Sequence, residues 1–586
     1  MSSAAAGPRR AAEWARKKDN KDNTDSKDSK DNKDSKDSKD RRTTMEHFEN
    51  RRYLTSFDSS QVPQVFCDVL VIGSGVAGLS AALSAVDGAD VLLIAKGPVD
   101  ESNTAKAQEG IAGALAPEDT PAAHMTDTLA TGQGICDPEI VRVITGEAPD
   151  RIRELIAWGA TFDEENGTLA LTREGGHSTS RIVHAMGDAT GKEVATTLIR
   201  RVRNMQGIQV VENAFVVDLI TTPEDGCCGA LLFDQRWGLM IVWAKSTILA
   251  SGGAGRLYRE TTNSVLATGD GLGMAYRAGV KLTDLEFYQF HPTALYVAGA
   301  SRALISEAVR GEGGILLNAR HERFMSKYHE RGELAPRDAV SRAIVNEIRE
   351  TWHTCAYLDM RHIPQLEKRF PGIKELCQQF DIDITKDLVP IRPAAHYMIG
   401  GVKVDINGVS TLPRLFACGE VACTGLHGAN RLGSNSLLEG LVVGRRAGTA
   451  ARQIAGGSNP PPHPRVKVRN SATQHVAIDV EDVTNALRAL AWRNVGIERS
   501  RFGLEETVHM LHFWGRYIMD KEFSDRAGWE LQNMLVVARL IAESATLRAE
   551  SRGVHFRTDF PRVDDERWKL HIIQRRQAKP EMEAVE

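Results

Sequence analysis

The sequence lacks several features that would place it in a common protein class. No run reaches the ~18 apolar residues that a membrane helix needs, and the longest mostly apolar stretch, Val65 to Val86, contains Asp68 and three glycines. The eight cysteines form no C-x-x-C pair and no cluster with metal-ligand spacing. We therefore expect no membrane association, no disulfide framework and no bound metal, but reduced thiols and a cytoplasmic location.

An excess of positive charge is also missing. The 586 residues carry a net charge of −4, and the part that follows residue 44 carries −8. Proteins that bind nucleic acids usually show a basic footprint, so we expect no nucleic-acid partner. Apolar residues make up 42% and charged residues 26%, which suits a large globular protein with a core of its own.

Two segments are unlike the rest of the chain. Between residues 17 and 42, Asp recurs at every third position and no apolar residue occurs. Nothing there offsets the entropy of ordering, so we predict a disordered low-complexity tail over residues 1–44 and hypothesise that translation starts at Met45. Gly456 to Pro464 contains three consecutive prolines and predicts an extended linker, after which helical patterns run from about Val483 to Arg552.

The strongest local signal is a G-x-G-x-x-G motif between a strand pattern over 65–72 and a helix pattern over 79–85. Gly73 permits a tight turn, Gly75 lets the backbone approach a pyrophosphate, and Gly78 allows close packing of helix on strand. The helix N-terminus offers free N–H groups to phosphates. The pattern predicts a dinucleotide site; the alternative is a glycine turn that serves packing alone.

The type of nucleotide is less clear from spacing. The acidic residue that holds a ribose at the end of the second strand, 91–95, is replaced by Lys96-Gly97, which weakens an NAD-dependent dehydrogenase interpretation. Two further strand-like segments, 246–255 and 415–420, also run into glycine turns. One nucleotide domain assembled from such separated segments favours FAD over NAD.

Several polar groups interrupt otherwise small or apolar segments. They are Arg173 to Ser178, Phe290 to Thr293, Ser306 to Gly313, Pro336 to Asp338, Pro393 to Tyr397 and His427 to Ser436. Their arginines, histidines and hydroxyls suit a dicarboxylate, because Arg binds carboxylates with two parallel hydrogen bonds. Any single one of these residues also has a plain structural explanation as an ion pair or a buried histidine.

Together these motifs resemble the succinate dehydrogenase/fumarate reductase flavoprotein family. The resemblance runs from about Cys67 to Pro561 and includes H-P-T-A-L, S-E-A-V-R-G-E-G-G, P-A-A-H-Y and H-G-A-N-R-L-G-S-N-S. It implies an α/β FAD-binding (Rossmann-like) domain with an inserted α+β capping domain and a C-terminal helical domain. The expected bounds are 65–284 and 398–460 for the FAD-binding domain, 285–397 for the capping domain and 468–586 for the helical domain.

Three residues favour the members of this family that oxidise L-aspartate. Asn103 stands where the dehydrogenases carry the histidine that bonds covalently to FAD, which implies noncovalent FAD. Glu174 lies in R-E-G-G-H-S, a loop that resembles the one facing the substrate ammonium. Ser434 replaces a glycine that is usual in the dehydrogenases. One departure from the family is Glu109, which stands where glycine is usual.

The resemblance also implies site residues. Those expected to hold FAD are Gly73, Ser74, Gly75, Val76, Ala77, Gly78, Lys96, Asn103, Thr104, Ala105, Lys106, Ala107, Gln108, Glu109, Gly110, Asp270, Glu420, Ser436 and Leu437. Those expected to bind substrate are Glu174, His291, Ser306, Glu307, His396, Arg431 and Ser434, and Arg337 resembles the proton-transfer arginine of the family.

The implied reaction is FAD-dependent oxidation of L-aspartate to iminoaspartate, with O₂ or fumarate as electron acceptor. It would be the first step of de novo NAD biosynthesis, with quinolinate synthase taking the unstable imine. The nearest alternative is a soluble fumarate reductase or a succinate dehydrogenase-type flavoprotein. An alternative of another class is a flavin-binding regulatory or scaffold protein without activity.

Overall fold

The computed structural model describes residues 47–585 apart from 300–301, 457–459 and 471–476. The predicted tail, residues 1–44, and Met45 lie outside the described residues. Within the described part, helix α11 ends at Gly456, and Pro460 to Pro464 contain neither helix nor strand, as the proline run predicts.

A mostly parallel sheet forms the centre of the molecule. Its strand order is β10-β11-β12-β2-β3-β9, with β19 also beside β12. Strands β2, β3, β9 and β19 all run parallel to their neighbours in this sheet, while β10 and β11 pair antiparallel at one edge. The strands are β2 Gln64–Ile72, β3 Val91–Ile94, β9 Ile208–Val211, β10 Ala214–Thr222, β11 Gly226–Asp234, β12 Gly238–Leu249 and β19 Leu415–Ala417. The predicted Rossmann-like βαβ unit is confirmed.

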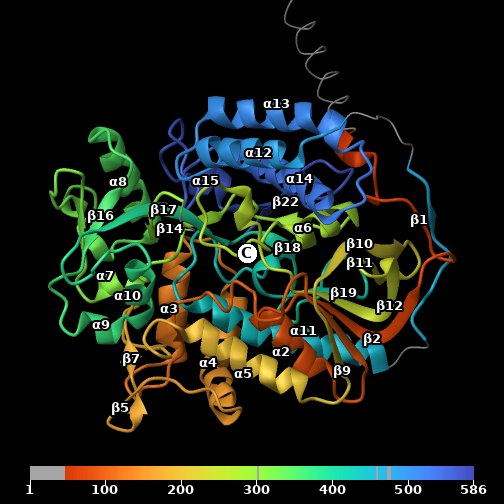
Figure 1. Cartoon of the computed structure of the whole chain (residues 1–586), viewed down its shortest axis with the longest axis horizontal. Helices are drawn as coiled ribbons and strands as arrows, with labels where there is room; N and C mark the ends of the chain where they lie inside the picture. The colour runs from red at the N-terminus through yellow and green to blue at the C-terminus, as the bar shows by residue number, and fades with distance from the viewer. Residues whose placement is uncertain (1–46, 300–301, 457–459, 471–476, 586) are drawn as a thin grey trace, which may run out of the picture.

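Helices cover the lower side of this sheet in Figure 1. They are α2 Val76–Ala85, α4 Pro138–Ala157, α5 Thr190–Arg203 and α11 Asn435–Gly456, while α3 Pro121–Thr131 packs on α4. The long helix α11 lies directly against α2, because Gly444 and Gly448 face backbone atoms of Ala77 and Ala81 with no room for a side chain. This close contact fixes the helix that follows the glycine turn.

A second, antiparallel sheet stands to the left in Figure 1, and its order is β14-β17-β16-β15. Its strands are β14 Tyr288–Leu295, β15 Ile315–Leu317, β16 Ala356–Asp359 and β17 Val389–Met398. The helices around it are α7 Glu307–Gly311, α8 Arg337–Glu350, α9 Leu366–Arg369 and α10 Pro371–Gln378. A separate apolar core, which includes Ile305, Leu358 and Ile391, holds this cap together.

The C-terminal region has the expected helices and, after them, two short strands. Helices α12 Val480–Asn494, α13 Arg501–Ile518, α14 Arg526–Leu547 and α15 Asp565–Trp568 are followed by strands β22 Leu570–Gln574 and β23 Glu581–Ala584. These strands complete the sheet β20-β18-β13-β22-β23, whose other members are β13 Leu282–Thr283, β18 Gly401–Lys403 and β20 Ala422–Cys423. The partner β13 is so distant in sequence that local periodicity does not reveal the pairing.

The same region shares its core with the central sheet. The Trp529 ring on α14 stacks on Phe215 of β10 with ring centroids 5.8 Å apart. Helix α14 of the C-terminal region therefore packs directly against the central sheet.

Short elements complete the described chain. They are β1 Phe57–Asp58 with β21 Lys467–Val468, β4 Ile111–Ala112 with β8 Ile182–Val183 and β7 Leu171–Thr172, β5 Glu164–Glu165 with β6 Thr168–Leu169, and α6 Asp270–Arg277. Among the described helices, none combines the length and the apolar character that crossing a bilayer requires.

Gly448→Ala tests the close contact between α11 and α2. The added Cβ would overlap the carbonyl oxygen of Ala81, so we expect the folded state to lose about 1–3 kcal/mol. Gly146→Ala, in the middle of α4, is the matched control because no atom lies within 4 Å of its added Cβ. That control should gain about 0.5–1 kcal/mol. Melting of both variants by differential scanning fluorimetry checks the pair, and equal melting temperatures would contradict the proposed contact.

Candidate active site

A cavity of about 700 Å³ opens at the end of the parallel strands. Residues from the glycine turn, the loop after β3, the segment after β12 and the start of α11 line it. Of the residues predicted to hold FAD, those in its wall are Gly73 to Ala77, Lys96, Asn103, Thr104, Lys106 to Gly110, Asp270, Glu420, Ser436 and Leu437. Gly78 and Ala105 do not line it.

The glycine turn has the shape that a pyrophosphate needs. A side chain on Gly73 would overlap the carbonyl of Ala250, and one on Gly78 would overlap the carbonyl of Gly73, so both glycines serve packing. A Cβ on Gly75 would meet protein only at 3.4 Å from the Thr104 hydroxyl, an ordinary contact. Gly75 lines the cavity and is therefore the glycine that leaves room for a ligand.

Polar groups without partners also fit a large polar cofactor. The buried Gln108 Oε1 and Ser251 Oγ accept or donate no hydrogen bond within the described chain, and both residues line the cavity. A buried polar atom left unpaired costs free energy, which a bound flavin nucleotide would relieve. The residues present therefore fit FAD.

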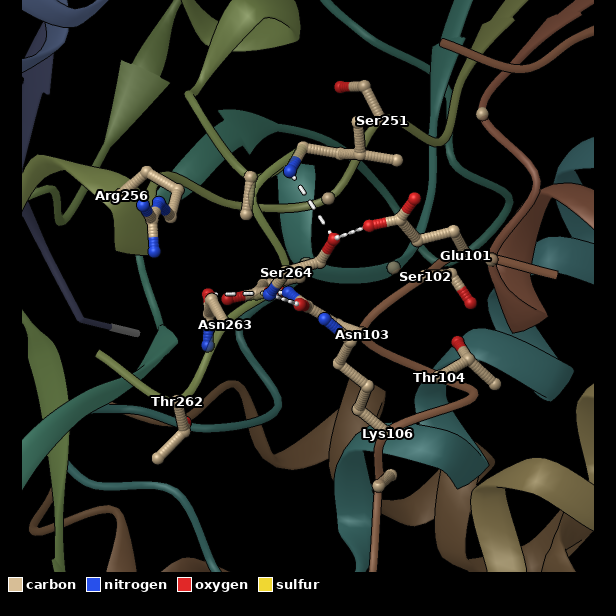
Figure 2. Close-up of a pocket in the computed structure, with 18 of the residues that line it drawn as sticks. Glu101, Ser102, Asn103, Thr104, Lys106, Ser251, Arg256, Thr262, Asn263 and Ser264 are labelled. Carbon is tan, nitrogen blue, oxygen red and sulfur yellow. Dashed lines mark hydrogen bonds between the residues drawn. The ribbon is translucent and has the colours of Figure 1, made fainter. Parts of the chain in front are cut away.

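Asn103 has a defined place in the wall. Its Oδ1 accepts from the backbone N–H of Ser264 at 2.8 Å, and its amide donates to Asn263 at 3.3 Å. Figure 2 shows Asn103 and Ser264 facing each other, with Glu101 reaching the Ser264 hydroxyl from the other side. Protein atoms thus hold the Asn103 amide in place. By the resemblance, the dehydrogenases carry a histidine at this position.

Lys96 and Asp270 bond to each other. The Lys96 ammonium lies 2.6 Å from Asp270 and 2.6 Å from Glu530 of α14. These two predicted cofactor residues therefore also tie the C-terminal helices to the edge of the cavity.

Sequence reasoning missed a stretch of the wall. Arg256 and the run from Arg259 to Ala267 line the cavity, as do Glu101 and Ser102. The polar run Glu260 to Ser264, which follows a glycine turn and precedes Asp270, was the signal available in the sequence.

Beside the cavity, six ionic side chains are buried together. Arg337 Nε donates to Glu307 Oε2 at 2.6 Å, and its Nη2 bonds Glu109. Arg431 Nη2 donates to the other oxygen of Glu109 at 3.0 Å. Arg310 lies 3.1 Å from Glu307, and Glu174 is the sixth member. We call Arg310, Arg337, Arg431, Glu109, Glu174 and Glu307 the ionic cluster.

Gln289 on β14 joins two of the arginines. Its Oε1 accepts from Arg337 Nη1 and from Arg431 Nη1, both at 3.2 Å. Sequence reasoning missed this residue, although it lies two positions before His291 and so on the same face of the strand. Gln289 sets the separation of the two guanidiniums.

Glu174 is a carboxylate with one oxygen free. Ser434, whose φ of 62° is left-handed, donates to its Oε2 at 2.7 Å, while Oε1 is buried with no partner in the described chain. Burial raises the pKa of Glu174 to about 8, and the Glu109 and Glu307 carboxylates act in the same direction. An ammonium group placed at Oε1 would relieve both effects.

Two neutral histidines complete the surroundings. His291 Nε2 and His396 Nε2 lie 3.6 Å and 4.0 Å from Glu109 Oε1. Burial lowers the pKa of His396 to about 3 and, with the Arg337 charge, lowers the pKa of His291 well below its usual value. Both rings are therefore uncharged at neutral pH and can hydrogen-bond a carboxylate.

The remaining predicted residues have structural partners. The Ser306 hydroxyl caps α7 by accepting from the Ala308 N–H at 3.2 Å.

Three side chains of the site could in principle hold a metal ion, because Glu109, His291 and Glu307 offer ligand atoms within 4.8 Å of one another. Both of these carboxylates are bonded to Arg337, so a guanidinium already supplies the positive charge there.

Comparison with known proteins agrees with this geometry. Residues 68–437 match an FAD binding domain and residues 484–586 match a fumarate reductase flavoprotein C-terminal domain. An L-aspartate oxidase of Streptomyces coelicolor is 44% identical, over 87% of this chain and 92% of that protein. The chain belongs to the L-aspartate oxidases of the succinate dehydrogenase/fumarate reductase flavoprotein family. A chloroplastic L-aspartate oxidase of Arabidopsis thaliana is 42% identical over 85% of this chain and 82% of its own.

Solved structures support the same family. A chain of a quinol-fumarate reductase solved with menaquinol molecules superposes with a TM-score of 0.83 at 31% identity, covering 90% of this chain and 99% of that one. The expected fold class is therefore confirmed, and FAD is the cofactor of this member of the L-aspartate oxidases.

The amide at position 103 predicts how FAD is held. A carboxamide is not a nucleophile, so we expect FAD to be released when the protein unfolds. Precipitation of the purified yellow protein with acid should leave the flavin absorbance in the supernatant. Yellow colour retained in the washed precipitate would show a covalent bond and contradict the prediction.

Proposed function

We propose that this protein oxidises L-aspartate to iminoaspartate. The observation that carries the proposal is the ionic cluster beside the FAD cavity, in which arginines suited to carboxylates lie near a carboxylate with a free oxygen suited to an ammonium. L-Aspartate carries both kinds of group. The curated relatives named L-aspartate oxidase support the same substrate.

The substrate carboxylates would be held from two sides. Arg431 and His396 line the cavity and would bind one carboxylate. His291 and Ser306 lie on the cap side, on β14 and at the start of α7, and would donate to the other carboxylate. Glu307, which accepts from Arg337 Nε, would hold that arginine in place at the same end. Charge-assisted hydrogen bonds of this kind fix both position and orientation.

Glu174 would read the amino group. Its free Oε1 can accept from the substrate ammonium, and Ser434 holds the other oxygen in place. Succinate and fumarate lack this ammonium, so Glu174 is the residue that distinguishes the proposed reaction from that of a fumarate reductase.

The wall of the cavity would hold FAD, with Gly75 leaving room for the pyrophosphate. Bound FAD would supply the acceptor for the hydride that leaves C2 of the substrate, and O₂ or fumarate would take the electrons on. The cap, which brings Arg337 against Glu109 in the cavity wall, would exclude water.

Arg337 is the group that we propose moves the balancing proton. Burial lowers the pKa of Arg337, but the Glu109, Glu307 and Glu174 carboxylates raise it by more than burial lowers it. The guanidinium therefore stays protonated beside them. It can accept a proton only when some of this negative charge moves away or is neutralised.

We also infer the setting of the reaction. Iminoaspartate hydrolyses readily, so an enzyme that consumes it, quinolinate synthase, would act next in NAD biosynthesis. The eight cysteines are all free and buried, which suits the cytoplasm.

An anaerobic titration tests the proposed reaction. L-Aspartate should bleach the flavin absorbance of the holoprotein, because it supplies the hydride, while succinate should not. Bleaching by succinate alone would move the protein to the dehydrogenases and would make our interpretation of Glu174 wrong.

The pKa of Glu174 predicts the pH dependence of activity. Below pH 8 Glu174 is mostly protonated and cannot attract an ammonium; above it the carboxylate can. We expect kcat/KM for L-aspartate to rise between pH 6.5 and about 8.5. Glu174→Gln should lower it by about tenfold or more and remove this rise, while leaving the affinity for succinate unchanged. A wild-type profile that is flat over this range would contradict the assignment.

A further inference from the structure

The centre of the ionic cluster is taken by a side chain of the protein itself. The two oxygens of Glu109 are bonded by Nη2 of Arg337 and Nη2 of Arg431, and its carboxylate also faces His291 and His396. The proposed function uses three of these four side chains, Arg431, His291 and His396, for the substrate carboxylates. Glu109 therefore sits among the donors that a substrate carboxylate would need.

A substrate carboxylate and Glu109 cannot use these donors together. Each oxygen of Glu109 occupies one guanidinium nitrogen that faces the site. Two carboxylates sharing the same two nitrogens would lie within a few ångströms of each other in a buried place, where like charges repel strongly.

The charge of Glu109 leads to the same conclusion. Burial raises the pKa of Glu109, but the Arg337 and Arg431 charges lower it by more. The pKa therefore lies well below its usual value, and the carboxylate is ionised in this buried place. A substrate carboxylate that enters beside it meets the repulsion of that charge.

The backbone around Glu109 is fixed, so a displacement of its carboxylate would come from the side chain alone. The backbone on both sides is anchored, because Ala107 O accepts from Gly191 N–H at 2.9 Å and Ala112 N–H donates to Ser434 O at 3.1 Å. A side chain on Gly110 would overlap Val183. The carboxylate, separated from this fixed backbone by three rotatable bonds, is held in place by the arginines.

We propose that Glu109 is an internal competitor of the substrate: it occupies the carboxylate-binding groups of Arg337 and Arg431 and must be displaced before a dicarboxylate binds. The inference rests on the proposed function, which supplies a dicarboxylate substrate. It makes Glu109 a residue that sets substrate affinity. Among the neighbouring carboxylates, Glu109 contributes most to raising the pKa of Arg337, so its displacement would also lower that pKa.

Binding of succinate to the full-length holoprotein tests the proposal without turnover. Glu109→Gln removes the charge and keeps the shape, and Glu109→Gly removes both. We expect each variant to lower the Kd for succinate by about tenfold or more, since juxtaposed like charges cost several kcal/mol. Titration calorimetry and the perturbation of the flavin spectrum give two independent readouts, and flavin content per protein shows that each variant retains its cofactor.

Glu347→Gln is the matched control. Glu347 is as buried as Glu109, is carried by the same helix as Arg337, and bonds Asn318 and Tyr328 rather than an arginine of the cluster. Its replacement should leave the Kd for succinate unchanged.

Either of two results would overturn the proposal: a Kd for succinate that stays within twofold of wild type in both Glu109 variants, or one that rises. A rise would mean that Glu109 belongs to the groups that hold the ligand. Failure of the proposed function gives a different result. In that case succinate binds the variants more tightly, yet L-aspartate bleaches the flavin of neither the wild type nor the variants.

Discussion

Charge buried away from water must be neutralised by nearby charge, and the active site of this protein depends on that constraint. The ionic cluster joins five separate parts of the chain: the loop before β4, the loop after β7, the cap helix α7, the cap helix α8, and the turn before α11. Removing one partner from a buried pair typically costs about 3–5 kcal/mol. The cap is therefore held against the FAD-binding body by the same groups that would bind substrate.

Because the same groups would bind substrate and hold the cap against the FAD-binding body, substrate binding and the position of the cap are linked. A ligand that replaces one of the carboxylates takes over its role in joining the cap to the body. Under the proposed function, the difference between an oxidase and a reductase would lie in a single feature, the Glu174 oxygen that has no partner in the described chain and could meet an amino group. The scaffold around it is shared, as the TM-score of 0.83 to a quinol-fumarate reductase indicates.

Local patterns in the sequence were sufficient for part of this structure. The strand, glycine turn and helix from Val65 to Ala85 follow from steric rules that act over a few residues, and the structure has them as expected. The motifs around His291, Arg337 and Arg431 pointed to a carboxylate site by residue type alone.

Other features depend on contacts that no local pattern contains. Gln289 joins two arginines that are distant in the chain, and its own sequence context is unremarkable. The position of Glu109 among the arginines follows from the folding of four segments onto one point; the sequence showed only that a glutamate stands where glycine is usual. The pairing of β22 with β13 likewise arises only in the completed fold.

The sheet that contains β13, β18 and β22 has a consequence for the speed of folding. Strand β22 pairs with β13, so residues 570–574 lie beside residues 282–283. Closing a chain segment of this length costs entropy before the pairing returns free energy, and contacts of this kind slow folding. Lys96 at the edge of the FAD cavity likewise bonds Glu530 of α14. The edge of the cavity thus depends on contacts between distant parts of the chain, which the glycine turn alone does not supply.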